Sequence, residues 1–166
     1  MPRQYTKIEY LSEVVLRVMR KLDLLSQVRR HRPYRNDVQA VHRYPNLLQR
    51  AFAQQLPNRI WASDITYIST AKGMVYMCAV IDLYGKMVLA YRIGNEMTFS
   101  LVNDAVREAR KKEKVADGLI LHSDQGSQYT SQAYFDLMQE YHIRPSMSSP
   151  GRPYDNAAME NFFGTL

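Results

Sequence analysis

The chain has 166 residues, of which 46% are hydrophobic and 23% are charged, and its formal net charge is +6. This length corresponds to one domain, and the single cysteine excludes a disulfide scaffold and suits a reducing cytosol. No apolar run approaches the roughly 20 residues of a membrane-spanning helix, and the amino-terminal residues lack the apolar stretch of a signal peptide. We therefore expect a globular domain with no membrane partner.

The charge is unevenly distributed along the chain. Residues 1–60 contain 12 Lys and Arg against 4 Asp and Glu, whereas residues 61–166 contain 10 against 12. The first part is therefore net +8 and the second −2. Such asymmetry indicates a basic arm attached to a slightly acidic domain, with a polyanion as the expected partner. A solvated basic linker without a partner explains the charge alone equally well.

The first elements in chain order are helical and basic. Apolar residues recur at helical spacing over residues 12–25, which predicts an amphipathic helix. The following tract is dense in Arg and His, contains two prolines and lacks apolar periodicity, so we interpret it as a linker. A short helix is expected over residues 47–56. These patterns divide the chain into a helical region over 1–26, a basic linker over 27–57 and a core domain over 58–166.

The core domain begins with three predicted strands joined by short turns. Alternation or a continuous apolar run predicts strands over 61–70, 74–84 and 87–94, which form an antiparallel meander. The remaining predictions are a helix over 98–112, a strand over 118–124, a helix over 131–142, a strand over 143–147 and a helix over 157–166. This order predicts an α/β fold in which helices flank a five-stranded mixed sheet. The same order is found in ribonuclease-H-like folds.

Three acidic residues of the core domain are candidates for one site. Asp64 lies within a strand and has no Lys or Arg within four residues, so its burial is costly without a partner. Asp124 ends an apolar strand, at a position where such sheets place their ligands. Glu160 lies near the start of the last helix. If the first strand is central and the fourth lies beside it, the two aspartates face each other and the helix brings in Glu160.

Three neighbouring carboxylates repel one another and need a cation. Oxygen ligands of this kind favour Mg²⁺ or Mn²⁺, and two such ions can activate a hydroxyl and stabilise the leaving oxygen of a phosphodiester. Each residue also has a structural explanation: Asp64 as an edge residue, Asp124 as a turn former and Glu160 as a surface residue. Asp82 competes for a place in the site, although the turn after it favours a role as a turn cap.

Four segments carry a resemblance to a known family. They are WASDITYI (61–68), VIDLYGKMVLAYRI (80–93), LHSDQGSQYTS (121–131) and SPGRPYDNAAMENFFGTL (149–166). In this order they resemble insertion-sequence transposases of the retroviral-integrase type, in which the second open reading frame of a bacterial element encodes the catalytic protein. The 35 residues between Asp124 and Glu160 match the family's Asp-Asp-35-Glu signature. The resemblance covers roughly residues 45–166.

The resemblance implies a catalytic function for the three carboxylates. Asp64, Asp124 and Glu160 would be the catalytic residues and the ligands of two Mg²⁺ or Mn²⁺ ions. Water would cleave the end of the element, and the freed 3′-hydroxyl would attack a target phosphodiester without a covalent protein intermediate. The implied partner is double-stranded DNA, as element ends and target, bound by a multimer at the bacterial nucleoid in the cytoplasm. No small-molecule substrate is implied.

Further residues are candidates for supporting roles. His122 and Asn156 match family positions and, with Gln125, are candidates for contacts that support the carboxylates or touch DNA; a packed strand histidine is an equally good interpretation of His122. The upstream helix resembles the end of a helix-turn-helix region, and the basic tract after it would follow phosphates. The DNA-binding candidates are Arg17, Arg20, Lys21, Arg29, Arg30, Arg32 and Arg35.

Both ends of the chain depart from the family pattern. The chain begins with only the last part of the helix-turn-helix region, and it ends at Leu166, inside the predicted last helix. We therefore expect a truncated copy with an intact fold, whose activity as a separate chain is open. One alternative is a non-catalytic DNA-binding remnant or regulator of the full-length transposase. Another, which the segment 149–166 disfavours, is a nuclease that cuts RNA in hybrids.

Overall fold

The computed structural model describes residues 14–15, 17–22, 42–115 and 117–166. The chain divides into two units, Met1–Arg35 and Asn36–Leu166. In the first unit, residues 14–15 and 17–21 are helical, within the range that the apolar spacing predicts. No helix in the described ranges has both the length and the apolar character needed to cross a membrane.

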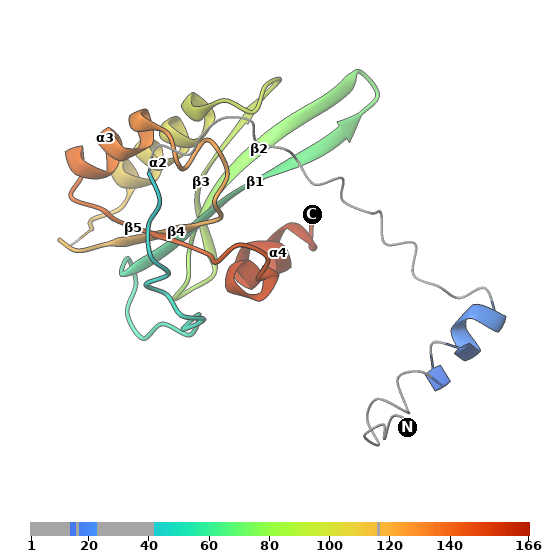
Figure 1. The fold of residues 1–166 in the computed structure, drawn as a ribbon. Coiled ribbons are helices and arrows are strands. Elements are labelled where there is room, and N and C mark those ends of the chain that lie inside the picture. Colours follow the sequence, from blue (N-terminus) through green and yellow to red (C-terminus); the bar gives the residue numbers. More distant parts are fainter. Residues whose placement is uncertain (1–13, 16, 23–41, 116) are drawn as a thin grey trace. The chain divides into compact units, whose positions relative to one another are not determined.

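The second unit is built on one five-stranded mixed sheet (Figure 1). Its strands are β1 (Ile60–Thr70), β2 (Gly73–Asp82), β3 (Met87–Gly94), β4 (Ile120–Ser123) and β5 (Arg144–Met147). The order across the sheet is β3-β2-β1-β4-β5, with β1, β2 and β3 antiparallel and β4 parallel to both β1 and β5. The predicted meander and mixed sheet are confirmed, and β1 occupies the centre.

Helices cover both faces of this sheet, as predicted. On one face, α2 (Phe99–Lys112) and α3 (Gln132–Glu140) pack over a core that contains Trp61, Cys78 and Val80. On the other face, α4 (Ala157–Phe163) buries Met159 against Ala79 and Ile81 (Figure 1). Because neighbouring residues of β2 belong to opposite cores, its continuous apolar run is buried on both faces.

Several predicted elements have different bounds. The helix expected over 47–56 is absent: Gln49 and Arg50 have φ values of 46° and 65°, which a right-handed helix cannot contain. The fourth strand is shorter than its apolar run, so Asp124 follows it. A 3₁₀ turn, η1 (Pro153–Asn156), leads into α4, which ends at Phe163 rather than continuing to residue 166.

Residues 42–52 form an irregular segment, here called the strap, that packs against the sheet unit. The His42 N–H donates to the Thr130 C=O, and the His42 ring stacks on Phe135 with centroids 4.4 Å apart. Leu48 is 2% exposed and belongs to the core that α4 closes. The strap therefore connects the α3 region to the face that carries α4.

Candidate active site

Asp64 lies in β1, and Asp124 directly follows β4, the parallel strand beside it. β1 pairs with β4 in a register that places Ala62 opposite His122. Asp64 is two residues after Ala62, and Asp124 is two residues after His122. Because residues two apart in an extended segment point to the same face, both aspartates are expected on the same face of the sheet. Burial and then the negative charge of Asp124 raise the pKa of Asp64, which fits two carboxyl groups at neighbouring positions of the sheet. The predicted central position of the first strand thus brings both aspartates together.

Asp64 is held by two hydrogen bonds in a largely buried position. Its Oδ1 accepts from its neighbour, the Ile65 N–H, at 2.7 Å, and its Oδ2 accepts from Asn156 Nδ2 at 2.8 Å. Burial, followed by the charge of Asp124, raises the pKa of Asp64 to about 7, although both hydrogen bonds act in the opposite direction. At neutral pH a bound proton and a bound cation would therefore compete for this carboxyl group.

Asp124 sits in a tight turn that depends on a glycine. The Gly126 N–H donates to Asp124 Oδ1 at 2.8 Å, and burial raises the pKa of Asp124. A Cβ at position 126 would lie 3.0 Å from the same oxygen and 3.2 Å from Gln128 Oε1. Glycine therefore lets the backbone approach the carboxylate, and the turn that the sequence predicts at this point also orients a site residue.

Glu160 lies in the first turn of α4 with an exposed side chain. Its charge also raises the pKa of Asp64, by less than that of Asp124. Within the described ranges, no three His, Cys, Asp or Glu side chains are grouped so that they could hold a metal ion. The structure thus brings two of the three predicted carboxylates into a pair and places the third on the helix that covers the same face.

The groups around the aspartate pair fit a hard divalent cation. The aspartates supply anionic oxygens, and burial followed by the charge of Asp124 disfavours the ionised form of Asp64 unless a positive charge is nearby. Asn156 Oδ1 is buried and has no hydrogen-bond partner among the described residues, although its Nδ2 is bound to Asp64. Such a set of carboxylate and amide oxygens has the ligand chemistry of Mg²⁺ or Mn²⁺ rather than of zinc.

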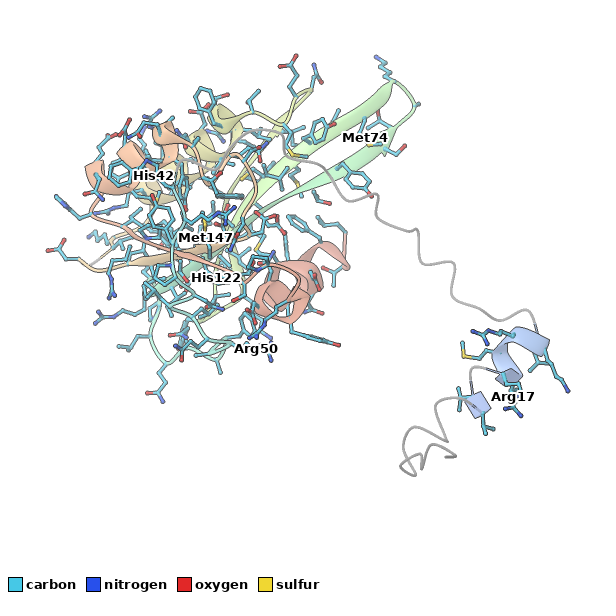
Figure 2. All side chains as sticks on the ribbon, in the orientation of Figure 1. Arg17, His42, Arg50, Met74, His122 and Met147 are labelled. Carbon is cyan, nitrogen blue, oxygen red and sulfur yellow. The ribbon has the colours of Figure 1, made fainter. Side chains whose placement is uncertain are left out.

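His122 is 1% exposed and is fully hydrogen-bonded (Figure 2). Its Nε2 faces the Asp155 C=O at 2.9 Å and must donate, so in the neutral ring Nδ1 accepts from Ser146 Oγ, also at 2.9 Å. Burial lowers the pKa of His122, which favours this neutral ring. Of the two interpretations of His122 from the sequence, the structure has the packed histidine, which joins β4, β5 and η1.

The remaining predicted residues have varied positions. Gln125 Nε2 donates to the Ser148 C=O and ties together the chain segments after β4 and β5. Asp82 accepts from the Asn58 and Tyr84 N–H groups, which confirms its role as a turn cap. The basic candidates of the first unit that the structure describes are exposed; they are Arg17, Arg20 and Lys21. The others lie outside the described residues; they are Arg29, Arg30, Arg32 and Arg35.

Two groups of residues near the carboxylates were not predicted. Ser63 Oγ and the Tyr129 hydroxyl are 3.0 Å apart and buried, and they join the residue beside Asp64 to the segment that follows Asp124. Asp155 is 3% exposed and accepts hydrogen bonds from the strap. No local pattern marks these residues, because their partners lie 66 to 109 positions away.

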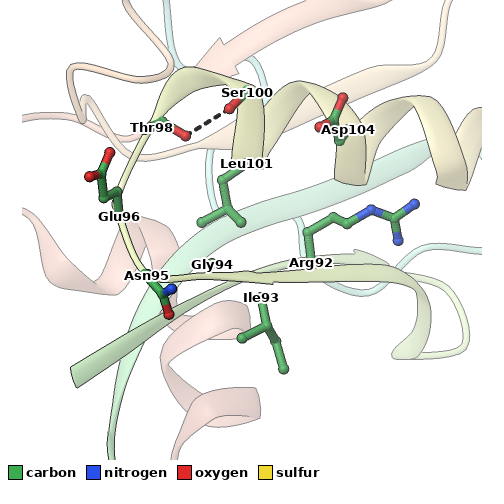
Figure 3. Close-up of a pocket in the computed structure, with 9 residues that line it drawn as sticks. All are labelled: Arg92, Ile93, Gly94, Asn95, Glu96, Thr98, Ser100, Leu101 and Asp104. Atoms are coloured by element: carbon green, nitrogen blue, oxygen red, sulfur yellow. Dashed lines mark hydrogen bonds between the residues drawn. The ribbon is translucent and has the colours of Figure 1, made fainter. Parts of the chain in front are cut away.

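A separate hollow lies where β3 leads into α2 (Figure 3). It is lined by residues 92–96, Thr98, Ser100, Leu101 and Asp104. Its charged side chains are of both signs, and the Thr98 and Ser100 hydroxyls bind each other at 2.8 Å. None of the three candidate carboxylates lines it, so we place the site at the aspartate pair.

Residues 54–153 match the family described as the integrase core domain. The chain belongs to this family. The matched residues include Asp64 and Asp124, whereas Glu160 lies beyond them. The match confirms the integrase-type core that the four sequence segments predicted.

Two curated relatives are transposases of bacterial insertion sequences. The chain is 41% identical over 122 residues to the transposase of insertion sequence element IS904 from Lactococcus lactis, a match that covers 74% of this chain and 48% of the relative. It is 40% identical over 121 residues to transposase InsF of insertion sequence IS3A from Escherichia coli K12, which covers 73% and 42%. The chain thus spans about half the length of these relatives.

Solved structures confirm the integrase-like, ribonuclease-H-like fold. The HTLV-2 integrase catalytic core domain in complex with magnesium has a TM-score of 0.55 at 22% identity, covering 66% of each chain. A chain of the simian T-cell lymphotropic virus intasome, in complex with a PP2A regulatory subunit, has a TM-score of 0.63 at 22% identity, covering 69% of this chain and 40% of the other.

Proposed function

We propose that this chain carries the catalytic core of a DNA transposase, which cleaves DNA strands and transfers them by a metal-dependent, integrase-type reaction. The observation that supports this most is the placement of Asp64 on β1 and of Asp124 directly after the neighbouring strand β4, within an integrase core domain. Burial and the charge of Asp124 raise the pKa of Asp64, and a bound cation would offset both effects. The relatives named above are transposases, and one structural neighbour was solved with magnesium.

In this proposal Asp64, Asp124 and Glu160 hold two Mg²⁺ or Mn²⁺ ions. When bound, such ions supply Lewis-acid activation of a hydroxyl and stabilisation of the leaving oxygen. Asn156 keeps one oxygen of Asp64 in place, and the Gly126 N–H does the same for Asp124. Glu160 has an exposed side chain on the helix that covers the same face of the sheet. Water would first attack a phosphodiester at the end of the element and release a 3′-hydroxyl. That hydroxyl would then attack a phosphodiester of the target, whose own 3′-oxygen leaves.

The proposed partner is double-stranded DNA, as both element ends and target, bound by a multimer at the nucleoid. The net charge of +8 over residues 1–60 supports this, because Lys and Arg that neutralise phosphates release counterions and strengthen binding at low salt. The exposed Arg17, Arg20 and Lys21 belong to this basic part. We assign the sequence-independent affinity for DNA to these basic residues, and strand cleavage and transfer to the three carboxylates of the sheet.

The function is tested by nicking of supercoiled plasmid DNA in Mn²⁺ or Mg²⁺. We expect metal-dependent nicking by the natural chain and its loss in Asp124→Asn, with Asp117→Asn as the control because Asp117 is an exposed aspartate between α2 and β4. Equal nicking by Asp124→Asn would refute the assignment of the site. Salt-sensitive DNA binding without any metal-dependent nicking would instead support a non-catalytic DNA-binding remnant.

A further inference from the structure

The Asp155 carboxylate is a buried junction between the strap and the turn before α4. It is 3% exposed and accepts three hydrogen bonds: Asn46 Nδ2 at 3.0 Å, Arg50 Nε at 2.7 Å and the Ser149 N–H at 3.3 Å. The Arg50 guanidinium is the main cause of a lowered pKa for Asp155. The carboxylate is therefore ionised at neutral pH, and its charge is balanced by a residue 105 positions away.

The backbone at the same point is tied to both aspartates of the site. The Asp155 C=O accepts from His122 Nε2, and His122 lies two residues before Asp124. The next residue, Asn156, donates to Asp64. Residues 155–156 thus contact the strap, β4 and β1 at once, and α4 begins immediately after them at Ala157.

The helix that carries Glu160 cannot set its own position. α4 has only seven residues, and its N-cap residue Asn156 makes no side-chain capping bond, while its Nδ2 donates to Asp64. Helices this short are marginal in water and depend on tertiary contacts. Met159 packs in the core with Leu48 of the strap, and Ala158, Phe162 and Phe163 pack against that core, while the contacts of residues 155–156 hold the start of the helix.

The strap adopts an unfavourable backbone where it meets Asp155. Gln49 and Arg50 both have positive φ values, and from this turn Arg50 Nε donates to Asp155 Oδ1. Non-glycine residues in this region cost free energy and persist only where surrounding contacts impose them. Arg50 also lies over the Tyr154 ring, 5.9 Å from its centroid, so its guanidinium is held from two sides.

We propose that Asp155, with Asn46 and Arg50 of the strap, is a positioning residue that holds Glu160 within reach of Asp64 and Asp124. This inference rests on the proposed function, because it assumes that the three carboxylates share a metal. It assigns the strap a role in the site although it contains none of the predicted ligands. Loss of the junction is expected to weaken metal binding through a misplaced α4.

The test measures the affinity of the protein for Mn²⁺ alone, by electron paramagnetic resonance of the free ion. Asp155→Asn removes the charge while keeping the shape, and Arg50→Gln removes the guanidinium from a side chain that is 51% exposed. We expect each to raise the Kd for Mn²⁺ by roughly tenfold, the lower end of the range for residues that support metal ligands. Glu108→Gln is the matched control, because it breaks ion pairs with Arg92 and Lys112 away from the junction.

A double-mutant cycle with Glu160→Gln separates positioning from general destabilisation. If Asp155 acts through Glu160, adding Asp155→Asn to Glu160→Gln changes the Kd by less than twofold, whereas a merely structural effect would add in full. Circular dichroism at the measuring temperature tests whether each variant is folded. If Asp155→Asn is unfolded, Arg50→Gln takes its place in the cycle. The positioning role of Asp155 would be overturned by an unchanged Kd in folded Arg50→Gln or Asp155→Asn, or by full additivity with Glu160→Gln. Neither outcome would affect the proposed function. Absence of Mn²⁺ binding by the natural chain would overturn the proposed function with it.

Discussion

Asn156 donates a hydrogen bond of 2.8 Å to Asp64 across 92 positions of the chain. The bond joins the residue before α4 to the central strand, and it leaves Asn156 Oδ1 buried with no partner among the described residues. A buried polar atom without a partner is costly, and in a native protein it calls for a ligand, a water or an ion. This pair of residues therefore couples the placement of α4 to the charge state of Asp64.

Removing the side-chain amide of Asn156 is expected to make metal binding more sensitive to pH. The Asn156 hydrogen bond lowers the pKa of Asp64, so Asn156→Ala raises that pKa further above 7 and lets protons compete more strongly with Mn²⁺. The loss of affinity in Asn156→Ala should be larger at pH 6 than at pH 8. Mn²⁺ titrations at the two pH values measure it, and Asn161→Ala, at an exposed position of α4, is the control. An equal loss at both pH values would contradict the coupling.

The metal-free protein is expected to lose stability as the pH rises from about 4 to about 7. Asp64 has a pKa of about 7 in the folded chain against an ordinary value of 3.8, so between these values the folded state binds more protons than the unfolded state. The contribution of Asp64 is thus fully present below pH 4 and lost above pH 7. Asp64→Asn should raise the melting temperature at pH 8 by roughly 5 °C and have little effect at pH 4.

The same melting experiment is repeated with a divalent cation added. Mn²⁺ or Mg²⁺ should restore the stability of the natural chain at pH 8, by about 2.7 kcal/mol at a concentration 100-fold above Kd. The Asp64→Asn variant should gain far less. A natural chain whose stability rises steadily from pH 4 to pH 8 without metal would show that Asp64 is not the dominant carboxylate.

Gly126→Ala is expected to impair metal binding more than folding. The added Cβ would lie 3.0 Å from Asp124 Oδ1, so the carboxylate must move away from its hydrogen-bond donor. The Kd for Mn²⁺ should rise several-fold while the melting temperature falls by only a few degrees. Gly85→Ala is the matched control, since the nearest contact of its Cβ is at 4.0 Å. Equal Kd values for the two alanine variants would refute the role of Gly126.

His122→Leu is expected to lower the free energy of unfolding by about 1–3 kcal/mol, because it leaves Ser146 Oγ without its acceptor and the Asp155 C=O without its donor. Urea unfolding measures this loss. His122→Asn should recover part of the stability only if its amide reaches the same carbonyl. A stability equal to that of the natural chain in His122→Leu would contradict the hydrogen-bond assignment.

The basic arm is expected to set the salt dependence of DNA binding. Replacing Arg29, Arg30, Arg32 and Arg35 with Gln should reduce the slope of log K against log salt by about 3.6, if all four contact phosphates. Binding to duplexes of unrelated sequence should weaken equally. Fluorescence anisotropy across salt concentrations measures the slope, and replacement of Lys111 and Lys112 on α2 is the control. An unchanged slope would place the phosphate contacts elsewhere.

The local pattern of the chain was sufficient to predict the sheet and most of its helices. Alternation in β1, the continuous apolar run of β2 and the amphipathic spacing of α2 are set by neighbours in sequence, so their bounds agree with the structure to within a few residues. The prediction of a helix over 47–56 was wrong. The apolar residues of this segment reach the core that α4 covers through a turn with positive φ values. Periodicity does not encode such a turn.

The residue pattern alone was enough to predict three candidate carboxylates: Asp64 within a strand, Asp124 at the end of a strand and Glu160 on a helix, with the spacing of an integrase-type core. The groups that surround and hold these carboxylates come from distant segments, so they are seen only in the folded chain. Asp155 could not be distinguished from a loop carboxylate by any local signal, because its partners Asn46 and Arg50 are more than 100 positions away. Hydrogen bonds between distant segments depend on packing, whereas strand and helix patterns depend on neighbours in the chain.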